Sequence, residues 1–312
     1  MHVFDAHCDA LLKLWRHPDL SFTEMDERLQ VSLPAMEAGQ VLIQTFAIWT
    51  PREIEAASRF HTALEMIELF YRKIIPAGLA PVLTAADLED CVLNNRKGAI
   101  LFVEGAEPVG ESMTYLRTLH RLGVRGMGLT WNNRNAIADG CLEPSAGGLS
   151  HFGREVIEEM NQLGMVIDVS HLAEPGFWDV LSITKQPIIA SHSNARALFE
   201  SPRNLSDEQI SALIANGGVM GLALFPPFYR EDNEAASIDD ILRHVEHICG
   251  LGGIDHVAIG ADFDGIDATF PGLEHAGTYP LLVEALLKRY QEAEVEKIMY
   301  KNWLRVFGNV LK

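Results

Sequence analysis

Eight short apolar segments recur along the chain, and longer segments with helical periodicity separate them. Several of the apolar segments are continuously apolar at their starts, as expected of strands that are buried on both faces. Strands that alternate with helices predict a parallel sheet, and eight is the number of strands that closes a (β/α)8 barrel, or TIM barrel. The predicted strands are residues 3–9, 42–49, 99–105, 126–131, 165–171, 187–193, 219–225 and 257–265.

Helical periodicity is clearest in five of the intervening segments. Apolar side chains recur at helical spacing in residues 53–74, and residues 206–215 begin with Ser206 and Gln209 in the capping-box pattern. The alternative fold is a doubly wound open sheet, which usually has a glycine-rich turn after its first strand. Here the first strand ends in His-Cys-Asp, so the sequence favours one barrel domain over residues 1–312. The remaining predicted helices are 153–163, 238–251 and 280–290.

The charge and the composition argue against several classes of partner. The chain has 25 basic and 43 acidic residues, a net charge of −18, which should repel nucleic acid and anionic membrane surfaces. No run of 18 apolar residues predicts a transmembrane helix, and no basic segment precedes an apolar one at the N-terminus, so we expect a cytoplasmic protein without a signal peptide. The four cysteines form no CxxC pair and are expected to be free thiols: Cys8, Cys91, Cys141 and Cys249.

Five of the eight predicted strands end in a residue that can bind a metal ion or move a proton. In a barrel, the carboxyl ends of the strands and the loops after them build the active site, so these residues should converge on one mouth. Other histidines lie on helical patterns and are expected to be solvated or structural: His61, His120, His244 and His247. The residues at the strand ends are His7, Asp9, Glu104, His171, His192, Asp262 and Asp264.

Strand alternation sharpens the prediction for the first strand. His7 and Asp9 should point the same way and chelate one ion, whereas Cys8 points the opposite way and packs. Asp5 should share the face of His7 but lie about 6–7 Å deeper. By the same rule Asp168 lies off the face of His171, so we leave it out of the site.

The chemistry of the predicted ligands indicates which metal they bind. Imidazole and carboxylate ligands without a thiolate suit zinc, with manganese or iron as alternatives. The ligands are too many for one tetrahedral ion, and a pair of ions that share a bridging carboxylate fits better.

Specific motifs extend over nearly the whole chain. They are DxHxD at 5–9, the EG pair at 104–105, the block at 148–171, SHSNARAL at 191–198, PRN at 202–204 and GADFDG at 260–265. With these motifs the chain resembles the membrane dipeptidase (renal dipeptidase) family of zinc peptidases, within the amidohydrolase-like barrels.

The resemblance implies two zinc ions per chain and a role for each ligand. His7 and Asp9 would bind the first ion, Glu104 would bridge both ions, and His171 and His192 would complete the second.

The resemblance also implies roles around the metal pair. Asp262 matches an aspartate beside the bridging water and, with Glu104, is a predicted catalytic residue. Arg203 matches an arginine that holds the terminal carboxylate of the substrate. Mammalian members carry a histidine after the fourth strand, where this chain has Trp131 followed by Asn132, and we expect both residues to line the substrate site. Asp264 is expected to order its loop.

These roles predict a zinc-dependent dipeptidase that hydrolyses dipeptides, including L-D dipeptides, by a hydroxide shared between the metals. The resemblance also implies that the chain forms a homodimer. A hydrolase of another small amide, such as an N-acyl amino acid, would use every metal ligand in the same way and stays open as the alternative. Phosphotriesterase-like lactonases and adenosine-deaminase-like enzymes open with His-x-His and fit less well. A non-catalytic relative would have lost ligands, and none is missing here.

Overall fold

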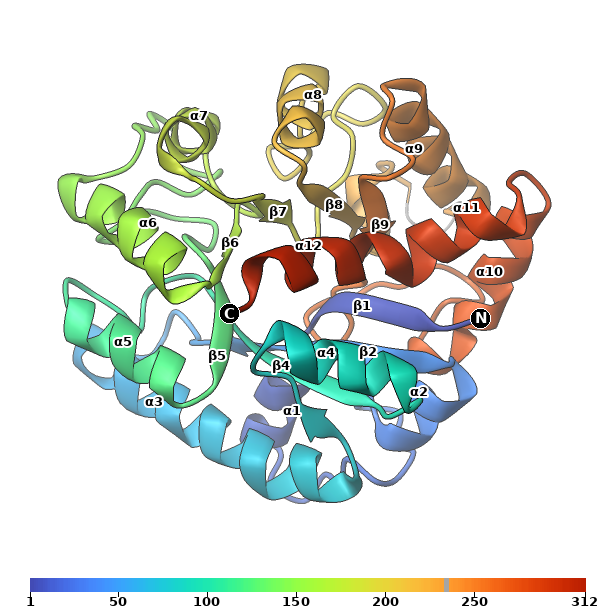
Figure 1. Ribbon diagram of the computed structural model, residues 1–312, viewed down its shortest axis with the longest axis horizontal. Coiled ribbons are helices and arrows are strands. Elements are labelled where there is room, and N and C mark those ends of the chain that lie inside the picture. Colours follow the sequence, from blue (N-terminus) through green and yellow to red (C-terminus); the bar gives the residue numbers. More distant parts are fainter. Residues whose placement is uncertain (233–235) are drawn as a thin grey trace.

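A closed ring of parallel strands lies at the centre of the molecule, which is a computed structural model that describes residues 1–232 and 236–312 (Figure 1). The ring consists of β1 (Val3–Cys8), β2 (Val41–Trp49), β4 (Gly98–Glu104), β5 (Val124–Gly128), β6 (Val166–Asp168), β7 (Ile189–Ala190), β8 (Val219–Leu222) and β9 (Val257–Ile259). Each strand pairs in parallel with its neighbours in this order, and the β1–β9 pairing closes the ring. The predicted (β/α)8 barrel is therefore confirmed. A short strand that was not predicted, β3 (Ala80–Pro81), pairs with the start of β4.

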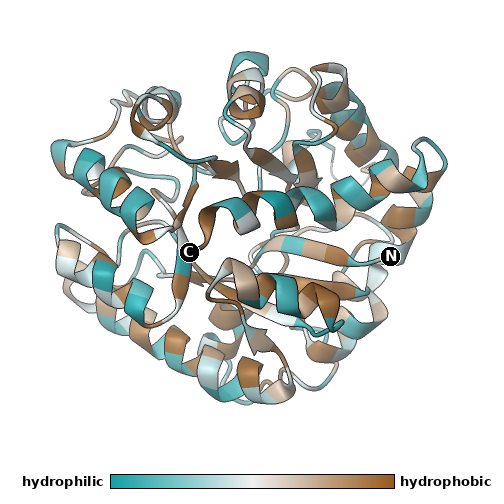
Figure 2. Cartoon of the chain, in the orientation of Figure 1, coloured by the Kyte–Doolittle hydropathy of each residue, from teal (hydrophilic) through white to brown (hydrophobic). Residues whose placement is uncertain are grey.

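Helices surround this ring, and Figure 2 shows hydrophobic residues on the strands while the helices carry hydrophobic and hydrophilic residues on different faces. The α-helices are α1 (Ala10–Arg16), α2 (Leu33–Ala38), α3 (Ala56–Leu69), α4 (Ala85–Leu93), α5 (Met113–Arg121), α6 (His151–Leu163), α7 (Glu174–Ile183), α8 (Asp207–Ala215), α9 (Ile238–Gly250), α10 (Tyr279–Leu287), α11 (Glu292–Glu296) and α12 (Asn302–Val310). Short 3-10 or π-helical segments are η1 (Phe70–Ile74), η2 (Ile75–Ala77), η3 (Pro226–Phe228), η5 (Ala276–Thr278) and η6 (Lys297–Lys301). Among the described residues, no helix has the length and apolar character that crossing a membrane requires.

The helix boundaries follow from local sequence signals. Ser206 and Gln209 form the predicted capping box at the start of α8, with each side chain bound to the backbone N–H of the other residue. Ser150 caps α6 by accepting a hydrogen bond from the backbone N–H of Gly153. The helix ends at Leu163, and the next residue, Gly164, has a left-handed backbone. The helix predicted over residues 53–74 is only partly α-helical. The α-helix α3 ends at Leu69, and the chain continues as the π-helical turn η1.

The last helix, α12, closes the end of the barrel at which the strands begin. Phe4 of β1 packs against Phe307 with ring centroids 5.1 Å apart, and both are fully buried. The Trp303 indole N–H donates to the carbonyl of Ile259 at 2.8 Å. Interior strand residues such as Val166 and Val219 belong to the same cluster as these α12 side chains. The opposite end of the barrel is thus left for the loops that follow the strands.

Five strands end three or more residues earlier than predicted, namely β5, β6, β7, β8 and β9. β6 ends at Asp168, β7 at Ala190 and β9 at Ile259, so His171, His192 and Asp262 lie in the loops that follow. His171 and Asp262 have left-handed backbones, with φ of 67° and 66°. Non-glycine residues rarely adopt this conformation, and it is concentrated at functional sites.

Two glycines let the backbone around Ser191, the residue directly after β7, pack closely inside the ring. A Cβ atom on Gly221 of β8 or on Gly260, directly after β9, would overlap the carbonyl oxygen of Ser191. Since backbone cannot swing aside as a flexible side chain can, these positions require glycine.

We therefore predict that Gly260→Ala lowers the free energy of unfolding by at least about 1–3 kcal/mol, the usual cost of overpacking a core. Urea unfolding would measure it. Gly308→Ala in α12 is the matched control, because a Cβ at Gly308 meets no atom within 4 Å and alanine favours a helix. Native stability in Gly260→Ala would show that the strands can separate at this point.

Candidate metal centre

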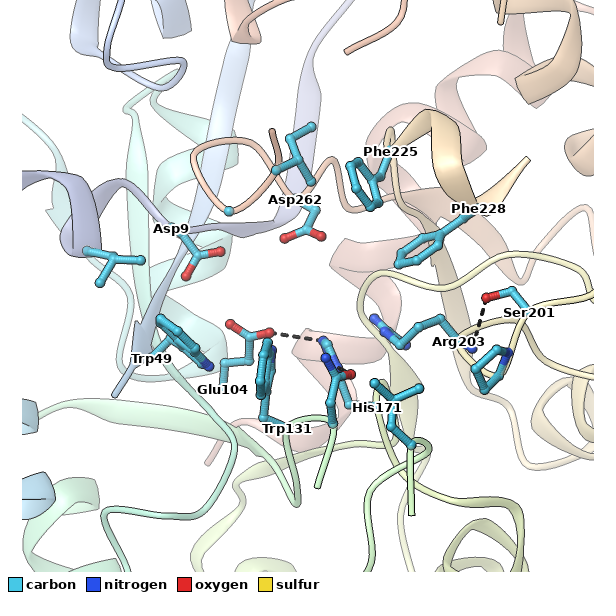
Figure 3. A pocket seen from close by; sticks show the side chains of 16 residues that line it. Asp9, Trp49, Glu104, Trp131, His171, Ser201, Arg203, Phe225, Phe228 and Asp262 are labelled. Atoms are coloured by element: carbon cyan, nitrogen blue, oxygen red, sulfur yellow. Dashed lines mark hydrogen bonds and ion pairs between the residues drawn. The ribbon is translucent and has the colours of Figure 1, made fainter. Parts of the chain in front are cut away.

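The residues predicted at the strand ends lie together at the carboxyl end of the barrel. Figure 3 shows the carboxylates of Asp9, Glu104 and Asp262 facing one open space, with His171 and Arg203 beside it. Backbone hydrogen bonds from Asp9 N to Phe263 O (2.8 Å) and from Asp262 N to His7 O (3.2 Å) tie the ends of β1 and β9 to each other. The predicted convergence of these side chains is confirmed.

His7 and Asp9 form one potential metal site with Asp262. His7 Nε2 lies 3.4 Å from Asp9 Oδ2 and 3.7 Å from Asp262 Oδ1. These ligand atoms lie within 4.8 Å of one another, so they could hold one ion. Cys8 points into the hydrophobic core, as predicted.

The prediction for Asp5 is wrong, because β1 is irregular. Asp5 pairs with Gln44 and Cys8 with Phe46, so β1 has one more residue than β2 between these points, as in a β-bulge. Phe4 and Ala6 on either side of Asp5 belong to the interior cluster. The carboxylate of Asp5 instead accepts hydrogen bonds from the Tyr279 hydroxyl (2.7 Å) and the backbone N–H of Ala261 (3.0 Å). The extra residue lets His7 reach the mouth of the barrel.

Glu104, the last residue of β4, contacts three histidines. Its Oε1 lies 3.0 Å from His171 Nε2 and 3.6 Å from His192 Nε2, while its Oε2 lies 3.5 Å from His7 Nε2. The Nε2 atoms of His171 and His192 are 2.8 Å apart, close enough for two ligands of one ion. Glu104 therefore offers one oxygen to each half of the site.

Burial and charge show that this group of residues suits a cation. Both ring nitrogens of His7 and Oδ1 of Asp9 are buried without a hydrogen-bond partner among the described residues. Burying unpaired polar atoms costs free energy unless a bound group, such as a metal ion, interacts with them. Burial raises the pKa of Asp262 to about 8; His7 opposes this shift, and the charges of Asp9 and Glu104 add to it. Burial also disfavours the charged form of Glu104, but His7 and hydrogen bonds from the other histidines lower its pKa overall. A bound cation would stabilise all of these carboxylates.

A cavity of about 370 Å³ lies over the carboxylates, and Arg203 forms part of its wall. Arg203 is only 5% exposed. One of its amino groups donates to the His192 carbonyl at 2.9 Å, and its guanidinium lies 5.3 Å from the centre of the Phe228 ring. Its Nε has no hydrogen-bond partner among the described residues. In the part of the chain that the structure describes, no carboxylate pairs with it. A buried guanidinium without an acidic partner is a natural site for an anion.

Trp131 and Asn132, the two residues expected at the substrate site, both line this cavity and lie in the loop after β5. The ring of Trp131 lies between Trp49 and His171, with centroid distances of 5.2 and 6.1 Å. Asn132 contacts a candidate ligand directly, since its Oδ1 lies 2.7 Å from His171 Nδ1. Asn132 is therefore placed to orient His171 as well as to line the cavity.

Asp264 orders its loop, as predicted. Its two carboxylate oxygens accept hydrogen bonds from the backbone N–H groups of Gln30 (2.7 Å) and Val31 (2.9 Å). The loop after β9 is thereby joined to the segment before α2.

Several residues that line the cavity, most of them apolar, were not predicted from the sequence. The positional rule that identified the ligands could have found Trp49, the last residue of β2, and Phe225, which follows β8. Neither side chain binds a metal ion or transfers a proton, so a rule restricted to such side chains does not select these two residues. The missed lining residues are Leu12, Trp49, Leu142, Ser201, Pro202, Phe225, Phe228, Gly265 and Ile266.

Comparison with known proteins agrees with this geometry. The chain is similar to a dipeptidase of Aspergillus oryzae, 33% identical over 305 residues that cover 93% of this chain and 72% of the relative. It is similar to a metallopeptidase from Rhodobacter sphaeroides that was solved with a phosphinate mimic of L-Ala-D-Ala, with a TM-score of 0.93, 29% identity and 99% of both chains covered. It is also similar to dipeptidase AC, a metallopeptidase of family M19, with a TM-score of 0.93, 30% identity, and 100% of this chain and 99% of the other covered.

The family model described as membrane dipeptidase (peptidase family M19) matches residues 1–312, which include the whole barrel and every candidate ligand. This chain therefore belongs to the membrane dipeptidase family, peptidase family M19.

Proposed function

We propose that this chain is a zinc dipeptidase whose substrates include L-D dipeptides. The single observation that carries the proposal is the placement of Arg203, a buried cation without an acidic partner among the described residues, in the same cavity as the carboxylates of the metal centre. A dipeptide has its scissile carbonyl and its terminal carboxylate only a few bonds apart, so one cavity can hold both groups. The mimic of L-Ala-D-Ala in the Rhodobacter sphaeroides relative supports the inclusion of L-D substrates.

Two zinc ions would fit the donor set. His7 and Asp9 would hold one ion, His171 and His192 the other, and Glu104 would contribute one oxygen to each. Zinc supplies a water of lowered pKa and polarises the scissile carbonyl. The chain itself would hold these ligands at the carboxyl ends of the strands and in the loops that follow them, and the rings of Trp131 and Phe228 line the cavity beside them.

We predict about two zinc ions per chain in carefully purified protein, because five ligands with a shared carboxylate suit a pair. Elemental analysis would measure the ratio. The barrel should stay folded after chelation, since its hydrophobic interior does not depend on the ions, and circular dichroism provides that control. Protein that retains no metal and gains no activity with zinc, manganese or cobalt would rule out this centre.

Asp262 is proposed as the general base and acid. It accepts a proton from the attacking water and then delivers it to the leaving amine. Its position supports this role, because its carboxylate lies 3.7 Å from His7 Nε2 and also lines the substrate cavity.

Asp262→Asn should reduce kcat by about 10²–10⁴, the usual contribution of general acid–base catalysis, while metal content stays near native. Steady-state kinetics with elemental analysis of the same sample would separate the two effects. Loss of metal would identify Asp262 as a required ligand, and native activity would exclude it from the mechanism.

Arg203 is proposed to bind the terminal carboxylate of the dipeptide. Its planar guanidinium matches a carboxylate, and burial strengthens the interaction. The alternative, a hydrolase of other small amides on the same metal site, is less favoured, because the family match is to dipeptidases over the whole chain. We propose that Trp131 and Asn132 line the substrate cavity, with Trp131 as an apolar wall.

Arg203→Met should weaken transition-state binding of free dipeptides by about 2–4 kcal/mol, as expected when one partner of a buried charge pair is removed. A C-terminally amidated dipeptide should be a poor substrate for the native enzyme and should lose little more in the variant. The measurement is kcat/KM for both substrates with both proteins. Equal cleavage of the two substrates by native enzyme would contradict the clamp and support the small-amide alternative.

A further inference from the structure

A buried chain of hydrogen bonds lies behind His192, on the side away from the cavity. Ser191 Oγ lies 2.7 Å from His192 Nδ1 and donates to Asp168 Oδ2 at 2.5 Å. Asp168, Ser191 and His192 are at most 3% exposed. Asp168 ends β6 and Ser191 follows β7, so pairing between neighbouring strands aligns the three groups.

The groups around Asp168 determine which hydrogen bonds each of its carboxylate oxygens accepts. Its Oδ1 accepts from the backbone N–H groups of Ser170 and Ser191, both at 2.9 Å, which leaves Oδ2 for the Ser191 hydroxyl. Within the described part of the chain, no lysine or arginine lies at ion-pair distance from Asp168. The hydrogen bonds through Ser191 and His192 instead connect this buried carboxylate to the metal centre.

The direction of each hydrogen bond follows from this arrangement. A carboxylate only accepts, so the single hydroxyl proton of Ser191 is donated to Asp168; the other acceptor within reach, Ser170 Oγ, is farther away at 3.4 Å. The Ser191 oxygen must then accept from His192, whose proton lies on Nδ1. The unprotonated nitrogen, Nε2, is the one that faces Glu104 and His171.

We propose that Asp168 and Ser191 are positioning residues that hold His192 in the one tautomer able to bind a metal through Nε2. This proposal rests on the proposed metal centre, in which His192 is a ligand. The three imidazoles of the centre are thereby supported in three ways. His192 has a hydroxyl backed by a carboxylate, His171 has the amide oxygen of Asn132, and His7 Nδ1 has no partner among the described residues.

Asparagine has nearly the same shape as aspartate, but Asp168→Asn should reverse the direction of the hydrogen bonds that reach His192. The two backbone N–H groups require an oxygen at the Oδ1 position, so the new NH2 group must face Ser191. An NH2 group donates, and the Ser191 hydroxyl would then have to donate to His192 Nδ1. The imidazole proton would move to Nε2, where it blocks the metal.

The test uses zinc-loaded protein labelled with 15N-histidine. Zinc affinity is measured by competition with a chromophoric chelator, and the imidazole N–H resonances are recorded by NMR. Ser191→Ala and Asp168→Asn should each weaken binding of the affected zinc about 10- to 100-fold, the usual effect of removing a group that supports a ligand. The Nδ1–H resonance of His192 should disappear in Asp168→Asn, where the proton moves to Nε2, and should shift upfield in Ser191→Ala, where the proton loses its acceptor. The Nδ1–H resonance of His171, held by Asn132, remains as an internal reference.

Ser193→Ala is the matched control, because Ser193 is equally buried on the other side of His192 and contacts Ser170, not the imidazole. It should keep native affinity and both resonances. Native zinc affinity in Ser191→Ala would overturn the proposal, and so would a loss of zinc affinity in Ser193→Ala as large as that in Ser191→Ala. The comparison of these two serine variants tests the proposal even if Asp168→Asn fails to fold. Native protein that holds no zinc would instead contradict the proposed metal centre.

Discussion

The carboxylate of Glu104 is the interaction that joins the two halves of the candidate centre. One oxygen faces His7, from the first strand of the ring, and the other faces the histidines that follow β6 and β7. Because Glu104 is the last residue of β4, its position depends on the pairing of β4 with β2, which carries seven residue pairs from Ile43–Gly98 to Trp49–Glu104. Closure of the barrel therefore determines whether the centre exists at all, since ligands from opposite sides of the ring meet only at its mouth.

The elements that could be predicted from the sequence are those whose pattern of apolar residues matches their burial in the folded chain. All eight strands of the ring were predicted because strands buried on both faces are short apolar runs. β3 was missed because it has only two residues, Ala80 and Pro81, and shows no such run. The proximity of His7, Asp9, Glu104, His171, His192 and Asp262 was also predictable, because the barrel places all strand ends at one mouth; the roles of these residues stay predictions.

Other features depend on backbone geometry that an alternation rule does not contain. One extra residue in β1 turned Asp5 away from the interior, and left-handed backbone after β6 and β9 sets the directions of His171 and Asp262. Asp168 was left out of the site because only the face toward the metal was considered. Its carboxylate lies behind a candidate ligand, a relationship that requires the β6–β7 register and cannot be obtained from spacing along one strand.

The packing of α12 against β1 has a consequence for how the chain is made. Phe4 packs against Phe307 and lies beside Trp303, so a side chain from the first strand depends on residues about 300 positions later. At a ribosomal rate of about 5–20 residues per second, β1 waits roughly 15–60 s for the helix that covers it. During that interval its apolar residues and unpaired edge are exposed, so the nascent chain, rather than the finished enzyme, is the form most in need of a chaperone.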